Sequence, residues 1–132
     1  MGELQKPSEE ISRFLKFLEL IEKDYAWAIE QMNQAENLTQ DYLHQLELQP
    51  STYHGRAHLA KRLKECRVHR RRMKDMFAVY GPVVELLRNE RGKLMVNQLQ
   101  QVLGKVRKEE RFLEERKYTP KVMKNEEFQM VQ

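Results

Sequence analysis

The side chains best suited to chemistry in this sequence are four histidines and a single cysteine. His54 and His58 are four residues apart, and Cys66 and His69 are three apart, so each pair shares one face of a helix. Pairs with this spacing bind metals on helices. The two pairs are separated by roughly 12 Å along the axis, so they cannot share one ion, and only the first could recruit His44. We therefore expect no metal site here.

The carboxylates do not have the spacing of a general acid and base. Adjacent glutamates at 9–10, 109–110 and 114–115 point in different directions on a helix. The sequence has no glycine-rich phosphate loop and no supported Ser/His/Asp arrangement. Cys66 falls on an apolar seam, which favours a packed small side chain over a nucleophile. We expect no catalytic residues and no cofactor, and hence a protein that acts by binding.

The composition is typical of long helices. Of the 132 residues, 40% are hydrophobic and 33% charged, with only five glycines and four prolines. We expect an all-α fold, an elongated antiparallel three-helix bundle or coiled-coil-like hairpin, because short loops join long helices. The predicted domain spans 1–119, with helices at about 8–49, 53–91 and 93–118 and a flexible tail at 120–132.

Apolar residues repeat with heptad spacing in the first two helices. In the first, ten of the twelve a and d positions between Ile11 and Gln49 are apolar, and Phe14 is one of them. Further apolar residues beside this seam predict packing on two neighbours.

In the second helix, eight of nine seam positions from Leu59 to Leu87 are apolar, with Arg70 as the exception. This seam continues through Pro82, where we expect a kink or a short break with the helix resuming in phase. The alternative is that Gly81 ends one helix and Pro82 begins another.

Local signals mark the helix ends. Ser8 is expected to cap the first helix, and Gly92 to separate the second from the third. The third helix should end near Tyr118, because Pro120 cannot continue it. Its apolar face is predicted to consist of Met95, Leu99, Val102, Val106 and Leu113.

Charge is segregated along the chain. Residues 1–50 carry four basic and ten acidic side chains, a net of −6, whereas residues 51–82 carry nine basic and two acidic, a net of +7. Arg70 lies on the seam and is expected to fix the register by pairing with an acid of the first helix. The candidate anion or nucleic-acid surface consists of Arg56, Lys61, Arg62, Lys64, Arg67, Arg71, Arg72 and Lys74.

Three interpretations of this basic block stay open. It can match the acidic first helix, contact nucleic acid, or dock on an acidic protein surface. Trp27 lies beside the first seam, where it is either the edge of the core or an anchor for a protein partner. Neither a signal-peptide pattern nor an apolar run of about 18 residues is present, so we expect a cytoplasmic protein without a membrane partner. Because no catalytic motif is found, we also expect no small-molecule substrate.

The stretch from Asn97 to Val122 contains Leu-Gly-Lys-Val-Arg-Lys and ends in Tyr-Thr-Pro-Lys-Val. Together with Tyr80 to Leu87, it resembles the C-terminal part of small helical proteins carried by phages and mobile elements of Gram-positive bacteria. The resemblance implies an accessory phage protein in the host cytoplasm and transfers no functional residues. We expect a non-catalytic interaction module that binds itself or a host protein. The alternatives are a nucleic-acid-binding protein and a structural or assembly component of a phage particle.

Overall fold

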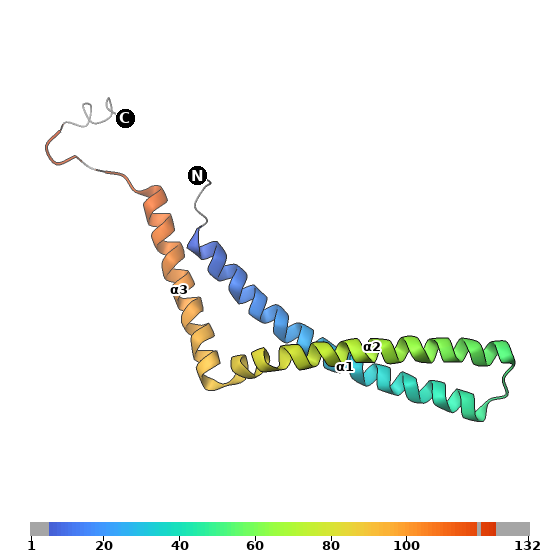
Figure 1. The fold of residues 1–132 in the computed structure, drawn as a ribbon. Coiled ribbons are helices and arrows are strands. Elements are labelled where there is room, and N and C mark those ends of the chain that lie inside the picture. Colours follow the sequence, from blue (N-terminus) through green and yellow to red (C-terminus); the bar gives the residue numbers. More distant parts are fainter. Residues whose placement is uncertain (1–5, 119, 124–132) are drawn as a thin grey trace.

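The computed structural model describes residues 6–118 and 120–123, and it consists of three helices (Figure 1). These are α1 (Pro7–Leu48), α2 (Tyr53–Arg88) and α3 (Glu90–Glu115). α1 and α2 form a long antiparallel hairpin, and α3 turns back from the end of α2 to lie beside the first part of α1. The prediction of an all-α helical bundle is confirmed.

The predicted seams form the contact between α1 and α2. Five seam residues of α1 are buried, and so are Leu59, Cys66, Met73, Val84 and Leu87 of α2. Phe14 is an exception, because 44% of it is exposed. The last turn of α2 lies level with Glu22, whose carboxylate is 3.7 Å from Arg88. Phe14 is eight residues, or about 12 Å, beyond that point, so α2 does not reach it.

α2 continues through Pro82 without a break. Val84 and Leu87, which follow Pro82, remain on the buried side of the helix. The alternative in which Gly81 ends one helix is therefore wrong, while the kink near Pro82 stays a prediction. A helix can tolerate one missing hydrogen bond when the apolar seam on both sides of it is buried.

The boundary between α2 and α3 lies at Asn89, not at Gly92 as predicted. The amide of Asn89 donates to the carbonyl of Glu85 at 3.2 Å and closes α2, while its side-chain oxygen accepts from the amide of Gly92 at 2.7 Å and caps α3. Gly92 is needed in the first turn of α3 for another reason. A Cβ there would lie 1.8 Å from the carbonyl oxygen of Leu86, so only glycine allows this sharp turn.

Two other helix ends differ from the predictions. α1 begins at Pro7, with Lys6 as the capping residue, so Ser8 lies inside the first turn and does not cap the helix. α3 ends at Glu115 instead of Tyr118. Acidic residues occupy its last turn, where the negative end of the helix dipole disfavours them. Residues 120–123 are irregular, and the rest of the predicted flexible tail lies outside the described residues.

The apolar face predicted for α3 is only partly buried. Leu103, which was not on the predicted face, is the buried leucine of this helix. Leu99 and Val106 are half-buried, whereas Met95, Val102 and Leu113 are exposed. α3 meets the early turns of α1 and the end of α2 along one edge of its apolar stripe, so the other edge stays uncovered.

Candidate interaction surfaces

The molecule has two parts with different surfaces. The three-helix end consists of α3, residues 7–27 of α1 and residues 76–88 of α2. The distal arm consists of residues 28–48 of α1 and 53–75 of α2, and α3 does not cover it (Figure 1). The arm is therefore two helices thick, and α2 carries the whole basic block along it.

Small side chains hold the two helices of the distal arm together. Ala28, Ala35 and Thr39 of α1 are buried, as is Cys66 of α2. The thiol of Cys66 donates to the carbonyl of Ala35 at 3.2 Å, and the hydroxyl of Thr39 donates to the same carbonyl at 2.8 Å. The expectation of a packed thiol on the seam is confirmed.

Two arginines of the basic block face the acidic helix. The Nε atom of Arg70 lies 2.8 Å from a carboxylate oxygen of Glu36, and the Nη1 atom of Arg67 lies 3.3 Å from the same oxygen. The buried Nε–H of Arg70 makes no aligned hydrogen bond, so the contact with Glu36 is an ion pair. The predicted pairing of Arg70 with an acid of the first helix is confirmed.

The other basic side chains of the block do not pair with α1. Arg62 lies 3.9 Å from Glu65 of its own helix, and Arg56 donates to the carbonyl of Ser51 at 3.4 Å. Within the described part of the chain, no ion pair is formed by Lys61, Lys64, Arg71, Arg72 or Lys74. Charge matching with α1 therefore accounts for only a minority of the block.

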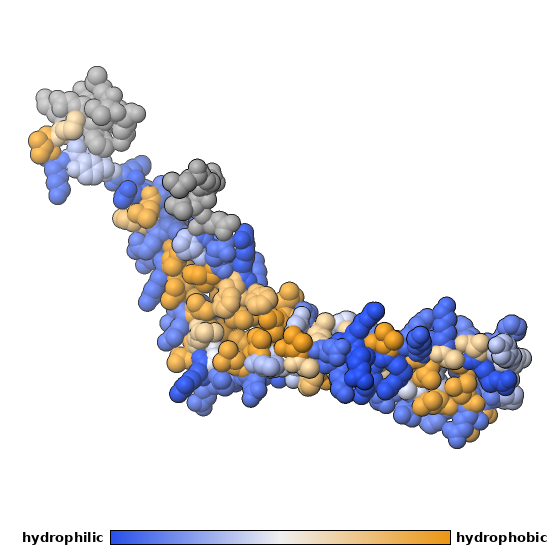
Figure 2. All heavy atoms as spheres, viewed as in Figure 1, coloured by the Kyte–Doolittle hydropathy of each residue, from blue (hydrophilic) through white to orange (hydrophobic). Residues whose placement is uncertain are grey.

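Four of these unpaired residues share the side of α2 that is turned away from α1. We call Lys61, Lys64, Arg71 and Arg72 the outer basic face. On a helix they lie within about 100° of one another, opposite the buried residues Leu59, Cys66 and Met73. All four are exposed. Figure 2 shows strongly hydrophilic residues gathered along this middle part of the arm.

The structure does not bring the two histidine and cysteine pairs together. His69 contacts Gln31 of α1 through its Nε2 atom at 2.9 Å, and Cys66 is bonded within the seam. His54 and His58 are exposed near the start of α2. In residues 6–118 and 120–123, no group of three His, Cys, Asp or Glu side chains is placed to hold a metal ion.

No known protein family, curated protein or solved structure matches this chain. The candidate surfaces therefore have to be judged on their own chemistry. None of the described helices has the length and apolar character needed to cross a membrane.

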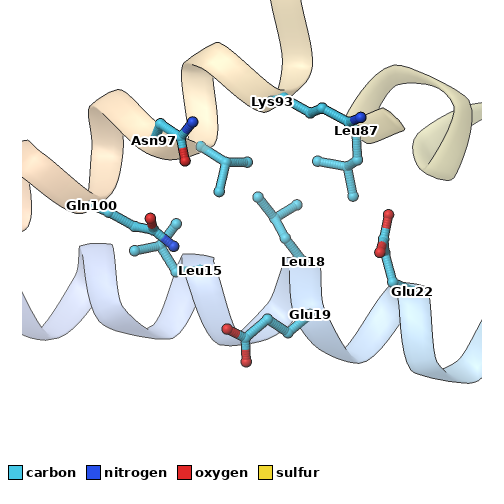
Figure 3. A pocket seen from close by; sticks show the side chains of 9 residues that line it. Leu15, Leu18, Glu19, Glu22, Leu87, Lys93, Asn97 and Gln100 are labelled. Carbon is cyan, nitrogen blue, oxygen red and sulfur yellow. The ribbon is translucent and has the colours of Figure 1, made fainter. Parts of the chain in front are cut away.

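A hollow of about 330 Å³ lies where the three helices meet (Figure 3). Leu18 of α1 and Leu87 of α2 point toward each other across it, and Lys93 and Asn97 of α3 border it. Glu22 lies on its opposite rim. No sequence pattern indicated this hollow, because its lining comes from three helices. An apolar floor with a few polar groups on its rim is the form that ligand-binding pockets commonly take.

The three-helix end also exposes large apolar side chains. Figure 2 shows hydrophobic residues forming a patch over α3 and the junction of the helices. Trp27 of α1 is 45% exposed, so it lies at the rim of the core, and its role as a partner anchor stays a prediction. We call the following six exposed residues the apolar end set: Phe14, Phe17 and Leu20 of α1, and Met95, Val102 and Leu113 of α3.

Proposed function

We propose that this protein is a non-catalytic interaction module that binds another protein, in the first place a second copy of itself, through the apolar end set. The observation that carries the proposal is the exposure of large apolar side chains at the three-helix end. Phe17 is 53% exposed and Leu20 is 56% exposed on α1, and Leu113 is 55% exposed on α3.

Side chains of this kind can form the apolar centre of a protein interface. A standard protein–protein interface buries about 800 Å² on each partner, and obligate homodimers bury more. The exposed side chains are also of the right kind, because phenylalanine, methionine and tryptophan are enriched in interfaces. Contiguous exposed apolar side chains commonly mark interaction sites.

The resemblance to small helical proteins of Gram-positive phages and mobile elements supports an accessory role in the host cytoplasm. A host protein is then the second partner to consider after a second copy. An assembly component of a phage particle is a further candidate that would use the same apolar surface. Both predict that the purified chain, if it is monomeric, binds a partner through the three-helix end.

Sedimentation velocity over a hundredfold range of concentration tests the proposal. We expect a dimer or higher oligomer whose dissociation constant rises at least about tenfold in the variant Phe17→Gln/Val102→Gln, because losing two apolar anchors costs more than about 1.4 kcal/mol. The matched control is Leu48→Gln/Val68→Gln, which removes two exposed apolar side chains from the distal arm. A wild-type monomer at every concentration, or equal weakening by both variants, would contradict self-association through this end.

A further inference from the structure

The outer basic face lacks an internal role in the described structure. Lys61, Lys64, Arg71 and Arg72 point away from α1, form no ion pair within the described residues, and are not covered by α3. Glu36, the acid of α1 that contacts the block, is already shared by Arg67 and Arg70. Placing four unpaired cations on one side of a helix raises the local positive potential without stabilising the hairpin.

The chemistry of this face favours a polyanion with closely spaced charges. Lys61 and Arg72 are eleven residues apart, so the face is about 17 Å long at 1.5 Å per residue. Double-stranded DNA carries one negative charge per roughly 1.7 Å of its axis, so a stretch of this length offers phosphates to all four side chains. Two acids lie close to the face: Glu65, within its span and paired with Arg62, and Asp75, three residues after Arg72. Even with both counted, residues 56–75 carry nine basic and two acidic side chains.

The surrounding residues distinguish between polyanions. The stretch 56–75 contains no Phe, Tyr or Trp on which unpaired bases could stack. Val68 is the only large apolar side chain that is exposed in that stretch, which is too little to insert into a lipid surface. A helix is about 10 Å across, and the major groove of B-DNA is about 12 Å wide, so the uncovered side of α2 fits against a duplex.

We infer that the outer basic face binds the phosphate backbone of double-stranded nucleic acid, without reading its sequence. This inference is independent of self-association, because it concerns the distal arm and not the three-helix end. Two copies joined at their three-helix ends would each keep this face available.

The test is a fluorescence anisotropy titration of a labelled 20-base-pair duplex with the full-length protein at 50, 100 and 200 mM salt. We expect a micromolar or tighter Kd at 50 mM salt and a log–log salt slope of about −4, since each phosphate contact contributes about −0.9. The variant Lys64→Glu/Arg71→Glu should weaken binding at 50 mM salt at least about tenfold. The control Lys105→Glu/Lys108→Glu makes the same change in net charge on α3 and should shift Kd less than about threefold.

Circular dichroism establishes that each variant is folded, and Lys64→Gln/Arg71→Gln replaces the reversal variant if that one unfolds. Single-stranded DNA, polyglutamate and vesicles with anionic lipid serve as competitors, each of which should displace the duplex only at higher charge concentration. The inference is overturned by an absence of duplex binding at 50 mM salt or by equal loss in the α3 control. Polyglutamate or vesicles that bind as tightly as the duplex would also overturn it.

Discussion

Glu110 of α3 accepts two hydrogen bonds from Ser8 at the start of α1, one from the hydroxyl at 2.6 Å and one from the backbone amide at 3.1 Å. The two residues are 102 positions apart in the chain. The amide of Ser8 is one of the free amides of the first turn, so a side chain of α3 supplies the cap that α1 lacks. Lys6 pairs with Glu114 beside it. These contacts join the C-terminal end of α3 to the N-terminal end of α1.

The hydrogen bonds between Ser8 and Glu110 should weaken in acid. The hydrogen bond from the Ser8 hydroxyl holds the pKa of Glu110 below its usual range, and the Ser8 amide and the charge of Lys6 act in the same direction. A carboxyl with a lowered folded-state pKa stabilises the fold fully above its unfolded pKa of about 4.3, and this contribution is lost as the pH falls through the folded value. Thermal unfolding between pH 3 and 7 should therefore show Glu110→Gln lowering Tm at pH 7 and converging with wild type near pH 3. A constant difference across that range would contradict the pairing.

Gly92 should be the glycine least able to accept a side chain. Gly92→Ala places a Cβ against the backbone of Leu86 and should destabilise the protein by about 2 kcal/mol or more, since no flexible side chain can move aside. The control is Gly104→Ala in the same helix, where a Cβ meets nothing within 4 Å. That change should stabilise the protein by about 0.5–1 kcal/mol. Urea denaturation measures both, and equal effects would refute a close approach at the α2–α3 turn.

The ion pair of Glu36 with Arg70 should matter more than the surface pairs. Glu36→Gln leaves a guanidinium that is only 25% exposed without its carboxylate, and we expect a loss of about 1 kcal/mol after allowance for solvent screening. Glu10→Gln, which breaks the exposed pair with Arg13, should cost less than about 0.5 kcal/mol. Combining Glu36→Gln with Arg70→Met should restore stability, because an apolar side chain needs no partner there. Denaturation of the wild type, the two single variants and the double variant measures the coupling between the two residues. Additive losses of unfolding free energy would show that they do not interact.

Trp27 should contribute to association rather than to the fold. Trp27→Ala is expected to leave Tm within a few degrees of wild type while weakening self-association, because nearly half of the residue is exposed on the rim of α1. Phe77→Ala provides the contrast. Its ring stacks on Tyr25 with centroids 4.9 Å apart, so its loss should cost about 2–3 kcal/mol of stability. Parallel calorimetry and sedimentation measure both effects, and a large drop in Tm for Trp27→Ala would assign it to the core.

Periodicity in the chain was enough to predict the helices and the α1–α2 seam. The pattern from Leu59 to Leu87 identified the buried side of α2, which stays the same before and after Pro82. This prediction was possible because the apolar repeat of a single helix is contained in its local sequence. The same reasoning placed Arg70 toward an acid of α1. It missed the boundary at Asn89, since glycine at position 92 is a stronger breaking signal than a capping asparagine, and it misread the reason for the glycine.

Features that depend on where separate helices meet were decided by the tertiary structure alone. Phe14 has a perfect heptad position and is nevertheless exposed, because α2 ends before reaching it. The composition of the basic block did not distinguish the two arginines that pair with Glu36 from the four side chains that face solvent. The cap of Ser8 by Glu110 joins residues near opposite ends of the chain. A helical pattern specifies which side of a helix is apolar, but only the lengths and turns of its neighbours determine how much of that side is covered.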